Sequence, residues 1–289
     1  MNPIVFHIAS GDSFFSGIAL LLTSFALAQS PRRMLNRLTA VTFLIGAVAV
    51  ALSSTAVPYG IYALAGLVTV AWIAVRSFPG WRKRAGIAAA VVWGAAVILE
   101  LPWHFAPQMD AVSSRSITVI GDSVTAGVGS DETSERWPQI LERNHSLTVL
   151  DISHVGETAA SALKRVRGHT ISSPIVIVEI GGNDLLGGTS SAAQFEKDLD
   201  ALLARITVVD RQVLMFELPL PPFHNEYGRI QRQAATKYNV QLIPRRRFLS
   251  VLAAGDATLD TIHLSQPGHR RMADCVWTVI GAAFDSETG

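Results

Sequence analysis

The stretch ITVIGDSVTAG, from Ile117 to Gly127, has the pattern of a buried β-strand that ends in a tight turn. Its β-branched residues favour a strand, and Gly121 permits the turn that follows. Ser123 then lies at the carboxyl end of the strand, beside an expected helix N-terminus that favours developing negative charge. The same Gly-Asp-Ser sequence would also cap a helix well without any chemistry. The rest of the chain must decide between a catalytic serine and a cap.

From Ser116 onward, short β-rich runs alternate with amphipathic stretches, which is typical of a parallel sheet covered by helices on both faces. Ligands of open parallel sheets bind beyond the carboxyl ends of the strands, where Ser123 is expected. The sequence therefore predicts an α/β domain with its site at that edge. The expected strands are 117–121, 147–152, 174–181 and 212–218, and the expected helices include 134–144, 158–168, 191–206 and 229–239.

A serine nucleophile needs a base, and the base needs an orienting acid. The C-terminal stretch DTIHLSQPGH places Asp260 three residues before His263. At this spacing on a tight loop or helical turn, the two side chains can face the same way. Asp260 can then accept from one ring nitrogen of His263 while the other nitrogen faces Ser123. Taken alone, Asp-x-x-His is equally compatible with a surface turn.

Two further positions fit an oxyanion hole. Asn183 in EIGGNDLL follows the third expected strand, and Gly156 in SHVGETA follows the second. The Asn183 amide and the Gly156 backbone N–H could each donate to a developing oxyanion, and such a donor is worth about 2.7–4 kcal/mol in a transition state. Both residues are otherwise ordinary turn residues. Asp122 and Asp184, which flank these positions, are expected to hold loops through hydrogen bonds.

In combination, the blocks VIGDSVTAG, the Gly156 block, VEIGGNDLL and DTIHLSQPGHRRMA resemble the SGNH, or GDSL, hydrolase family, most closely its lysophospholipase/thioesterase branch. The resemblance covers roughly 116–284 and implies a flavodoxin-like α/β/α sandwich that uses no metal or cofactor. Family members often carry Pro directly after the histidine, where this chain has Leu264. The resemblance implies Ser123 as nucleophile, His263 as general base and then acid, Asp260 as the residue that orients His263, and an oxyanion hole of the Ser123 and Gly156 backbone N–H groups with the Asn183 side chain.

The first third of the chain is strongly apolar, and a membrane-spanning helix needs about 20 mostly apolar residues. The uncharged run 38–75 is too long for one span and is interrupted by Pro58 and Gly60. Four apolar runs in succession disfavour buried helices of a soluble domain, and the absence of Lys and Arg from 1–12 disfavours a cleaved signal peptide. The sequence therefore predicts transmembrane helices near 13–29, 38–56, 60–76 and 85–102.

A second Gly-Asp-Ser sequence ends at Ser13, but it opens the first of these helices and no strand precedes it, so we predict no chemistry there. The loops after the first and third spans are basic, and basic short loops stay in the cytoplasm. We therefore expect a bacterial inner-membrane protein with its catalytic domain on the periplasmic side. The predicted organisation is a transmembrane region 1–106, a linker 107–115 and an SGNH hydrolase domain 116–289.

The composition excludes several classes of function. A formal net charge of +1 gives no basis for nucleic-acid binding, and a single cysteine excludes an internal disulfide and a Cys-based zinc site. Cys275 is expected to be a buried core thiol. The run Arg245-Arg246-Arg247 is expected to form a solvated face. Alanine- and glycine-rich spans allow helix packing within one chain or between chains, so no oligomeric state is predicted.

The sequence therefore predicts a membrane-anchored serine esterase that hydrolyses lysophospholipids or other lipid esters through an acyl-enzyme. The Pro-rich stretch LPLPPFHNEYGR, with Phe223 and Tyr227, favours an apolar acyl group. One alternative is an O-acetyl esterase or acyltransferase that acts on envelope glycans with the same residues. A second alternative is a non-catalytic membrane scaffold whose hydrolase domain only binds a ligand.

Overall fold

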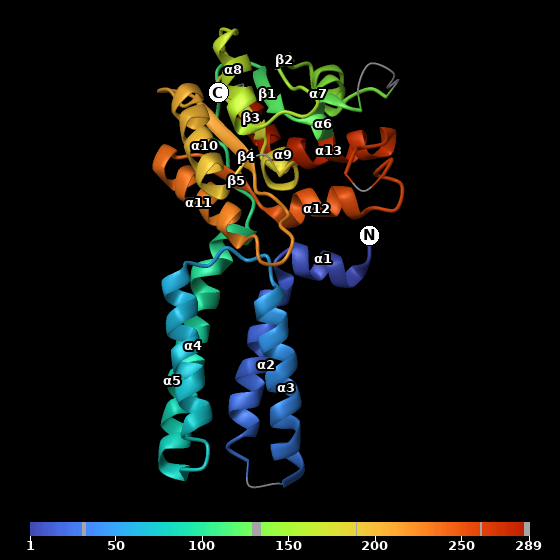
Figure 1. The fold of residues 1–289 in the computed structure, drawn as a ribbon. Coiled ribbons are helices and arrows are strands. Elements are labelled where there is room, and N and C mark those ends of the chain that lie inside the picture. Colours follow the sequence, from blue (N-terminus) through green and yellow to red (C-terminus); the bar gives the residue numbers. More distant parts are fainter. Residues whose placement is uncertain (31–32, 129–133, 189, 261, 286–289) are drawn as a thin grey trace. The chain divides into compact units, whose positions relative to one another are not determined.

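The structure is a computed structural model that describes residues 1–30, 33–128, 134–188, 190–260 and 262–285. It divides into two compact units (Figure 1). The first, which we call the α/β unit, contains Met1–Asn2, Phe105–Pro219 and Glu226–Gly289. The second, which we call the helical unit, contains Pro3–His104 and the short segment Leu220–Asn225.

The α/β unit is built on one parallel sheet with the strand order β2-β1-β3-β4-β5. This is the flavodoxin-like order, in which ligands bind at the carboxyl ends of β1 and β3, where the direction of winding reverses. The predicted parallel α/β fold is confirmed, and the four expected strands are present. The strands are β1 (Ser116–Gly121), β2 (Thr148–Asp151), β3 (Ile175–Glu179), β4 (Gln212–Phe216) and a short β5 (Gln241–Ile243) that the sequence pattern did not predict.

Helices cover both faces of this sheet (Figure 1). Alternate strand residues such as Ile117 and Ile177 pack with α7, α12 and α13 in one apolar core, because successive side chains of a strand point to opposite faces. On α10, Phe195, Leu199 and Leu203 are buried at helical spacing. The helices are α6 (Ser123–Ala126), α7 (Trp137–His145), α8 (Ala159–Arg167), α9 (Gly182–Leu186), α10 (Ala192–Ile206), α11 (Asn225–Tyr238), α12 (Arg245–Ala253) and α13 (Gln266–Ile280).

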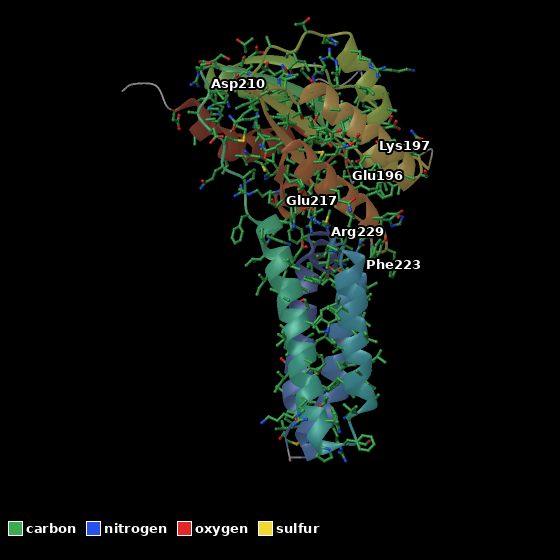
Figure 2. All side chains as sticks on the ribbon, turned by 90° about the vertical axis from the view of Figure 1, so that its left-hand side faces the viewer. Glu196, Lys197, Asp210, Glu217, Phe223 and Arg229 are labelled. Carbon is green, nitrogen blue, oxygen red and sulfur yellow. The ribbon has the colours of Figure 1, made fainter. Side chains whose placement is uncertain are left out.

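The expectation that Arg245 lies on a solvated face is wrong. Arg245 opens α12 and is fully buried, where its guanidinium pairs with Glu217, the residue after β4. Figure 2 labels Glu217 within the α/β unit. Arg232 binds the same carboxylate at 2.8 Å. Burial opposes ionisation of Glu217, but the charges and hydrogen bonds of the two arginines outweigh it and lower its pKa to about 2. A buried charge requires such partners, and the acidic Glu217 at the end of the apolar run 212–218 was the visible sign of one.

The helical unit contains the apolar segments of the first third of the chain. The predicted break around Pro58 is present, since α3 ends at Leu52 and α4 begins at Tyr59. Gly17 of α2 and Gly46 of α3 permit close packing of these two helices, because an added Cβ on either would lie within 2.9 Å of the other's carbonyl oxygen. The helices are α1 (Pro3–Ala9), α2 (Asp12–Leu27), α3 (Arg33–Leu52), α4 (Tyr59–Ala74) and α5 (Pro79–Glu100), followed by a 3₁₀ turn (Leu101–His104).

Within the described residues, one continuous helical segment, Pro79–His104, is long and apolar enough to cross a membrane, with a mean hydropathy of 1.8. The helices Pro3–Ala9 and Asp12–Leu27 meet at a bend of 88°. Together they are long and apolar enough for a second spanning segment if they form one broken span. The apolar parts of α3 and α4 are shorter than a usual span. The four predicted transmembrane helices therefore remain a prediction.

Candidate active site

Ser123 is the first residue of α6, at the carboxyl end of β1, and is largely buried. Asp122 caps this short helix, and its Oδ1 accepts a hydrogen bond from the Val124 N–H at 2.9 Å. Gly121 does not adopt a left-handed conformation. Instead, a Cβ at this position would lie 2.4 Å from Thr125 Oγ1. The glycine is therefore needed because α6 folds tightly against the end of β1, not because the turn requires a positive φ.

The structure brings Ser123, His263 and Asp260 into one hydrogen-bonded series. Ser123 Oγ lies 3.1 Å from His263 Nε2, and His263 Nδ1 lies 2.7 Å from Asp260 Oδ2. If Nδ1 carries the proton that Asp260 accepts, Nε2 is left as the acceptor for the serine hydroxyl. Ser123 and His263 are 140 residues apart in the sequence, and Asp260 lies three residues before His263. All three side chains meet beyond the carboxyl end of β1.

Asp260 is held in its ionised form by local hydrogen bonds. Its Oδ1 accepts from the backbone N–H of Ile262 at 2.7 Å and of His263 at 2.9 Å. The Ile262 bond, followed by the bonds from the side chain and backbone of His263, lowers the pKa of Asp260 far below its ordinary value. The carboxylate can therefore orient His263 and stabilise an imidazolium.

Asn183 lies in α9, just beyond β3, and its side chain connects the other predicted oxyanion positions. Its Nδ2 donates to Asp122 Oδ2 at 3.2 Å and to the Glu157 carbonyl at 3.0 Å. These acceptors are the residue before Ser123 and the residue after Gly156. Gly156 has a φ of 75°, which favours glycine. Within the described part of the chain, no acceptor is found for the Ser123 or Gly156 backbone N–H.

A pair of buried carboxyl groups lies behind this site. Glu179, the last residue of β3, accepts from the Thr125 hydroxyl at 3.0 Å, and its carboxyl group is within hydrogen-bonding reach of that of Asp122. Burial raises the pKa of both groups, and the proximity of the two carboxylates raises that of Glu179 further. Burial and mutual repulsion therefore disfavour a negative charge on both groups at once. Glu179 was missed in the sequence, although an acidic residue at the end of an otherwise apolar strand was a visible signal.

Asp184 also holds a loop as expected, since its Oδ2 accepts from the Ala159 N–H at the start of α8 at 3.0 Å. Cys275 is half-buried and packs against the edge of the core instead of lying within it as expected, and its partial burial raises the pKa of the thiol. Among the described residues, no group of three or more His, Cys, Asp or Glu side chains could hold a metal ion.

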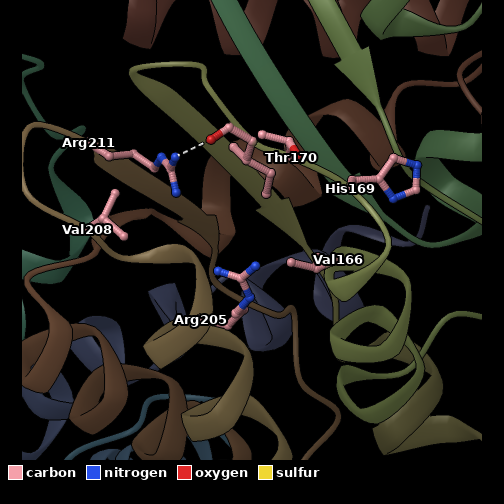
Figure 3. Close-up of a pocket in the computed structure, with 7 residues that line it drawn as sticks. Val166, His169, Thr170, Arg205, Val208 and Arg211 are labelled. Atoms are coloured by element: carbon pink, nitrogen blue, oxygen red, sulfur yellow. Dashed lines mark hydrogen bonds between the residues drawn. The ribbon is translucent and has the colours of Figure 1, made fainter.

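A hollow of about 250 Å³ lies elsewhere in the α/β unit, among residues that precede β3 and β4 (Figure 3). Its lining includes Arg205 and Arg211. The Arg211 guanidinium donates to the carbonyls of Ile171, Ser173 and Ile206, so it binds the loops together. The amino ends of these strands lie at the opposite edge of the sheet from Ser123, so this hollow is not part of the candidate active site.

Comparison with known proteins identifies the family of the α/β unit. The sequence model of the GDSL-like Lipase/Acylhydrolase family matches residues 119–271, which is more than half of the chain. A comparison with curated proteins found no match.

Several solved structures are similar. The crystal structure of TesA has 25% sequence identity and a TM-score of 0.51, covering 58% of this chain and 99% of TesA. The psychrotrophic esterase EstA from Pseudoalteromonas sp. has 20% identity and a TM-score of 0.52, covering 58% of this chain and 98% of its own. A lipase/acylhydrolase from Enterococcus faecalis has 20% identity and a TM-score of 0.51, covering 61% and 100%. The chain belongs to the GDSL-like lipase/acylhydrolase family and is a carboxylic ester hydrolase.

Proposed function

We propose that the protein is a membrane-anchored serine esterase that hydrolyses lipid esters such as lysophospholipids, with Ser123, His263 and Asp260 as its catalytic triad. The observation that carries this proposal is the hydrogen-bonded series from Ser123 Oγ through both ring nitrogens of His263 to Asp260. This geometry supplies a nucleophile, a base and an orienting carboxylate in the required order.

In the proposed reaction, His263 Nε2 takes the hydroxyl proton as Ser123 Oγ attacks the ester carbonyl. Asp260 stays ionised and stabilises the imidazolium that forms. The tetrahedral intermediate collapses when the alcohol oxygen receives the proton from His263, which leaves an acyl-serine. A water molecule then attacks this ester with His263 again as base, and the acid leaves as Ser123 recovers its proton.

The oxyanion would be held by the backbone N–H groups of Ser123 and Gly156 and by the side chain of Asn183. The two backbone donors make no other hydrogen bond within the described residues, which supports this role. Asn183 Nδ2 already donates to Asp122 and Glu157. It would therefore have to share or exchange its bond to the Glu157 carbonyl when the oxyanion forms.

The membrane part of the proposal has separate support. The chain carries a segment of spanning length, Pro79–His104, beside three further apolar helices. The basic residues 82–84 at the start of α5 favour a cytoplasmic location for that end. The α/β unit would then face the periplasm, where lipid esters are within reach and acyl-CoA is not expected.

The test uses detergent-purified full-length protein and its Ser123→Ala variant. We expect hydrolysis of p-nitrophenyl esters and of lysophosphatidylcholine, with a preference for long acyl chains, and labelling of Ser123 by a fluorophosphonate. All of these should vanish in the variant. A strong preference for acetate would instead indicate an acetyl esterase. A folded wild-type protein that neither turns over nor takes the label would favour a ligand-binding scaffold.

A further inference from the structure

The helical unit contains an apolar hollow of about 430 Å³. Its floor includes the buried side chains of Leu21 from α2 and Trp93 from α5. Its rim includes Ala51 of α3 and Val70 of α4, which are exposed, so the hollow opens sideways between α3 and α4. The volume falls in the range of about 300–1,000 Å³ that is typical of small-molecule sites.

The polar groups of the wall are mostly satisfied within the protein. Thr69 Oγ1 donates to the Ala65 carbonyl at 2.6 Å and accepts from Trp93 Nε1 at 3.0 Å. The Tyr62 hydroxyl donates to the Thr55 carbonyl. A buried water molecule needs about two to four polar partners, and an apolar cavity that lacks them takes up hydrocarbon instead. The wall of this hollow is therefore suited to an alkyl chain.

One polar atom of the wall has no partner. Asn225 comes from the segment Leu220–Asn225, which belongs to the helical unit. Its Nδ2 donates to the carbonyls of Ser53 at 3.2 Å and Thr55 at 2.8 Å, and these bonds fix the orientation of the amide. Its Oδ1 is buried and has no hydrogen-bond partner among the described residues. A ligand hydroxyl at this point would satisfy the acceptor, which is otherwise buried without the hydrogen bond that water would supply.

The hollow is long and narrow. Its lining residues on α4 run from Tyr62 to Ile73, a length of roughly 17 Å at about 1.5 Å per residue, and those on α3 run from Phe43 to Ala51, roughly 12 Å. Divided by these two lengths, the volume corresponds to a mean cross-section of roughly 25 to 36 Å². A helix with its side chains is about 10–12 Å wide and is too thick for this space. An extended alkyl chain is narrow enough to fit it.

We propose that this hollow binds a single-chain lipid, with its acyl chain along α3 and α4 and a hydroxyl near the head of the lipid donating to Asn225 Oδ1. Asn225 lies at the end of the hollow where α3 ends and α4 begins, since it binds the connecting segment through Ser53 and Thr55. The binding goes beyond ester hydrolysis and does not depend on Ser123.

The test uses full-length protein with Ser123→Ala, so that the probe is not consumed whatever the activity of the wild type. The probe is lysophosphatidylcholine with a photoreactive diazirine in its acyl chain, and the labelled peptides are located by mass spectrometry. We expect labels on the facing sides of α3 and α4. Labels confined to the α/β unit, or spread evenly over the outward faces of α2 to α5, would overturn the proposal.

Two glycines provide a matched pair of variants. An added Cβ on Gly66, which lines the hollow, or on Gly94, which does not, meets no atom within 4 Å. Gly66→Phe should fill the hollow and reduce labelling about tenfold, equivalent to roughly 1.4 kcal/mol of binding, whereas Gly94→Phe should not. Equal labelling of the two would refute the site. Should Gly66→Phe lose its wild-type elution profile and unfolding temperature, Val70→Trp narrows the same hollow from its rim and gives the same test.

The role of Asn225 is tested by competition. Unlabelled lysophosphatidylcholine carries a free glycerol hydroxyl, and its methyl ether lacks that donor but keeps the chain and headgroup. We expect the ether to compete about tenfold less well, within the range of about 5–150-fold that 1–3 kcal/mol represents. Equal competition would exclude the proposed hydrogen bond to Asn225.

Discussion

Asp122 is expected to position Asn183, the proposed oxyanion donor, and Asp122→Asn tests this. In the structure one carboxylate oxygen of Asp122 caps α6 through the Val124 N–H, and the other accepts from Asn183 Nδ2. An asparagine has only one side-chain oxygen. If that oxygen keeps the cap, its NH₂ group faces the NH₂ group of Asn183, so two donors meet and the bond that holds Asn183 is lost.

The size of the effect follows from that one bond. Leaving a buried donor without its acceptor costs about 1–3 kcal/mol, which is a factor of about 5–150, and this range is an upper limit for the partly buried Asn183. If the lost hydrogen bond lets Asn183 move out of position, the transition state loses that amount of stabilisation. The value of kcat for p-nitrophenyl acetate should then fall by that factor, while KM changes little. The upper limit is complete loss of one oxyanion donor, about 2.7–4 kcal/mol.

A double-mutant cycle separates positioning from general damage. If Asp122 acts through Asn183, the effects of Asp122→Asn and Asn183→Ala on kcat should not add. Asp184→Asn is the matched control, because Asp184 is also a buried helix-capping carboxylate but has no hydrogen bond to Asn183. Wild-type kcat in Asp122→Asn, or additive effects in the cycle, would refute the reasoning.

Three further predictions concern stability and catalysis. The pKa of Glu217 is lowered from 4.5 to about 2, so its ionisation contributes roughly 3 kcal/mol that is complete above pH 4.5 and is lost as the pH falls toward 2. The urea midpoint should fall over that window, and Glu217→Gln should cost about 3–5 kcal/mol at pH 7 and remove this pH dependence. Asp260→Asn should lower kcat for p-nitrophenyl acetate about 10²–10⁴-fold, because His263 loses its acceptor, and an unchanged kcat would exclude Asp260 from the triad. Gly121→Ala places a methyl group against Thr125 and should cost about 1–3 kcal/mol, seen as a lower melting temperature, and an unchanged one would show that α6 can shift.

The central strands of the sheet could be predicted from the sequence because they are buried on both faces. β1 and β3 therefore appear as short runs rich in Ile and Val, and each is followed by the polar residues of the site. β5 has three residues and no such run, so nothing in Gln241–Ile243 distinguished it from a loop. The helix over Arg245–Ala253 was hidden for a different reason. Three consecutive arginines suggest solvent, and only the distant Glu217 explains why the first of them is buried.

In the helical unit, too, the sequence predicted some features and not others. Hydropathy located α2 to α5 and the break at Pro58, because these depend on local composition and on the proline itself. It did not predict α1, a short helix that meets α2 at a sharp bend. Nor did it indicate the hollow, which depends on how side chains of four helices and the segment Leu220–Asn225 pack together.

The acidic residues of the site show why position in the sequence could suggest roles but not assign them. Asp260 is an exposed carboxylate that accepts two backbone N–H groups, so its charge is stabilised and available to an imidazolium. Asp122 and Glu179 are buried side by side, so desolvation and mutual repulsion favour a shared proton. Environments that separate pKa values in this way also separate functions. The exposed acid would therefore assist proton transfer at His263, whereas the buried pair, which carries a single negative charge when it shares one proton, would hold α6 and Asn183 in place. A charge on both members of that pair would push them apart, at the point where Ser123 and Asn183, the proposed nucleophile and oxyanion donor, are attached.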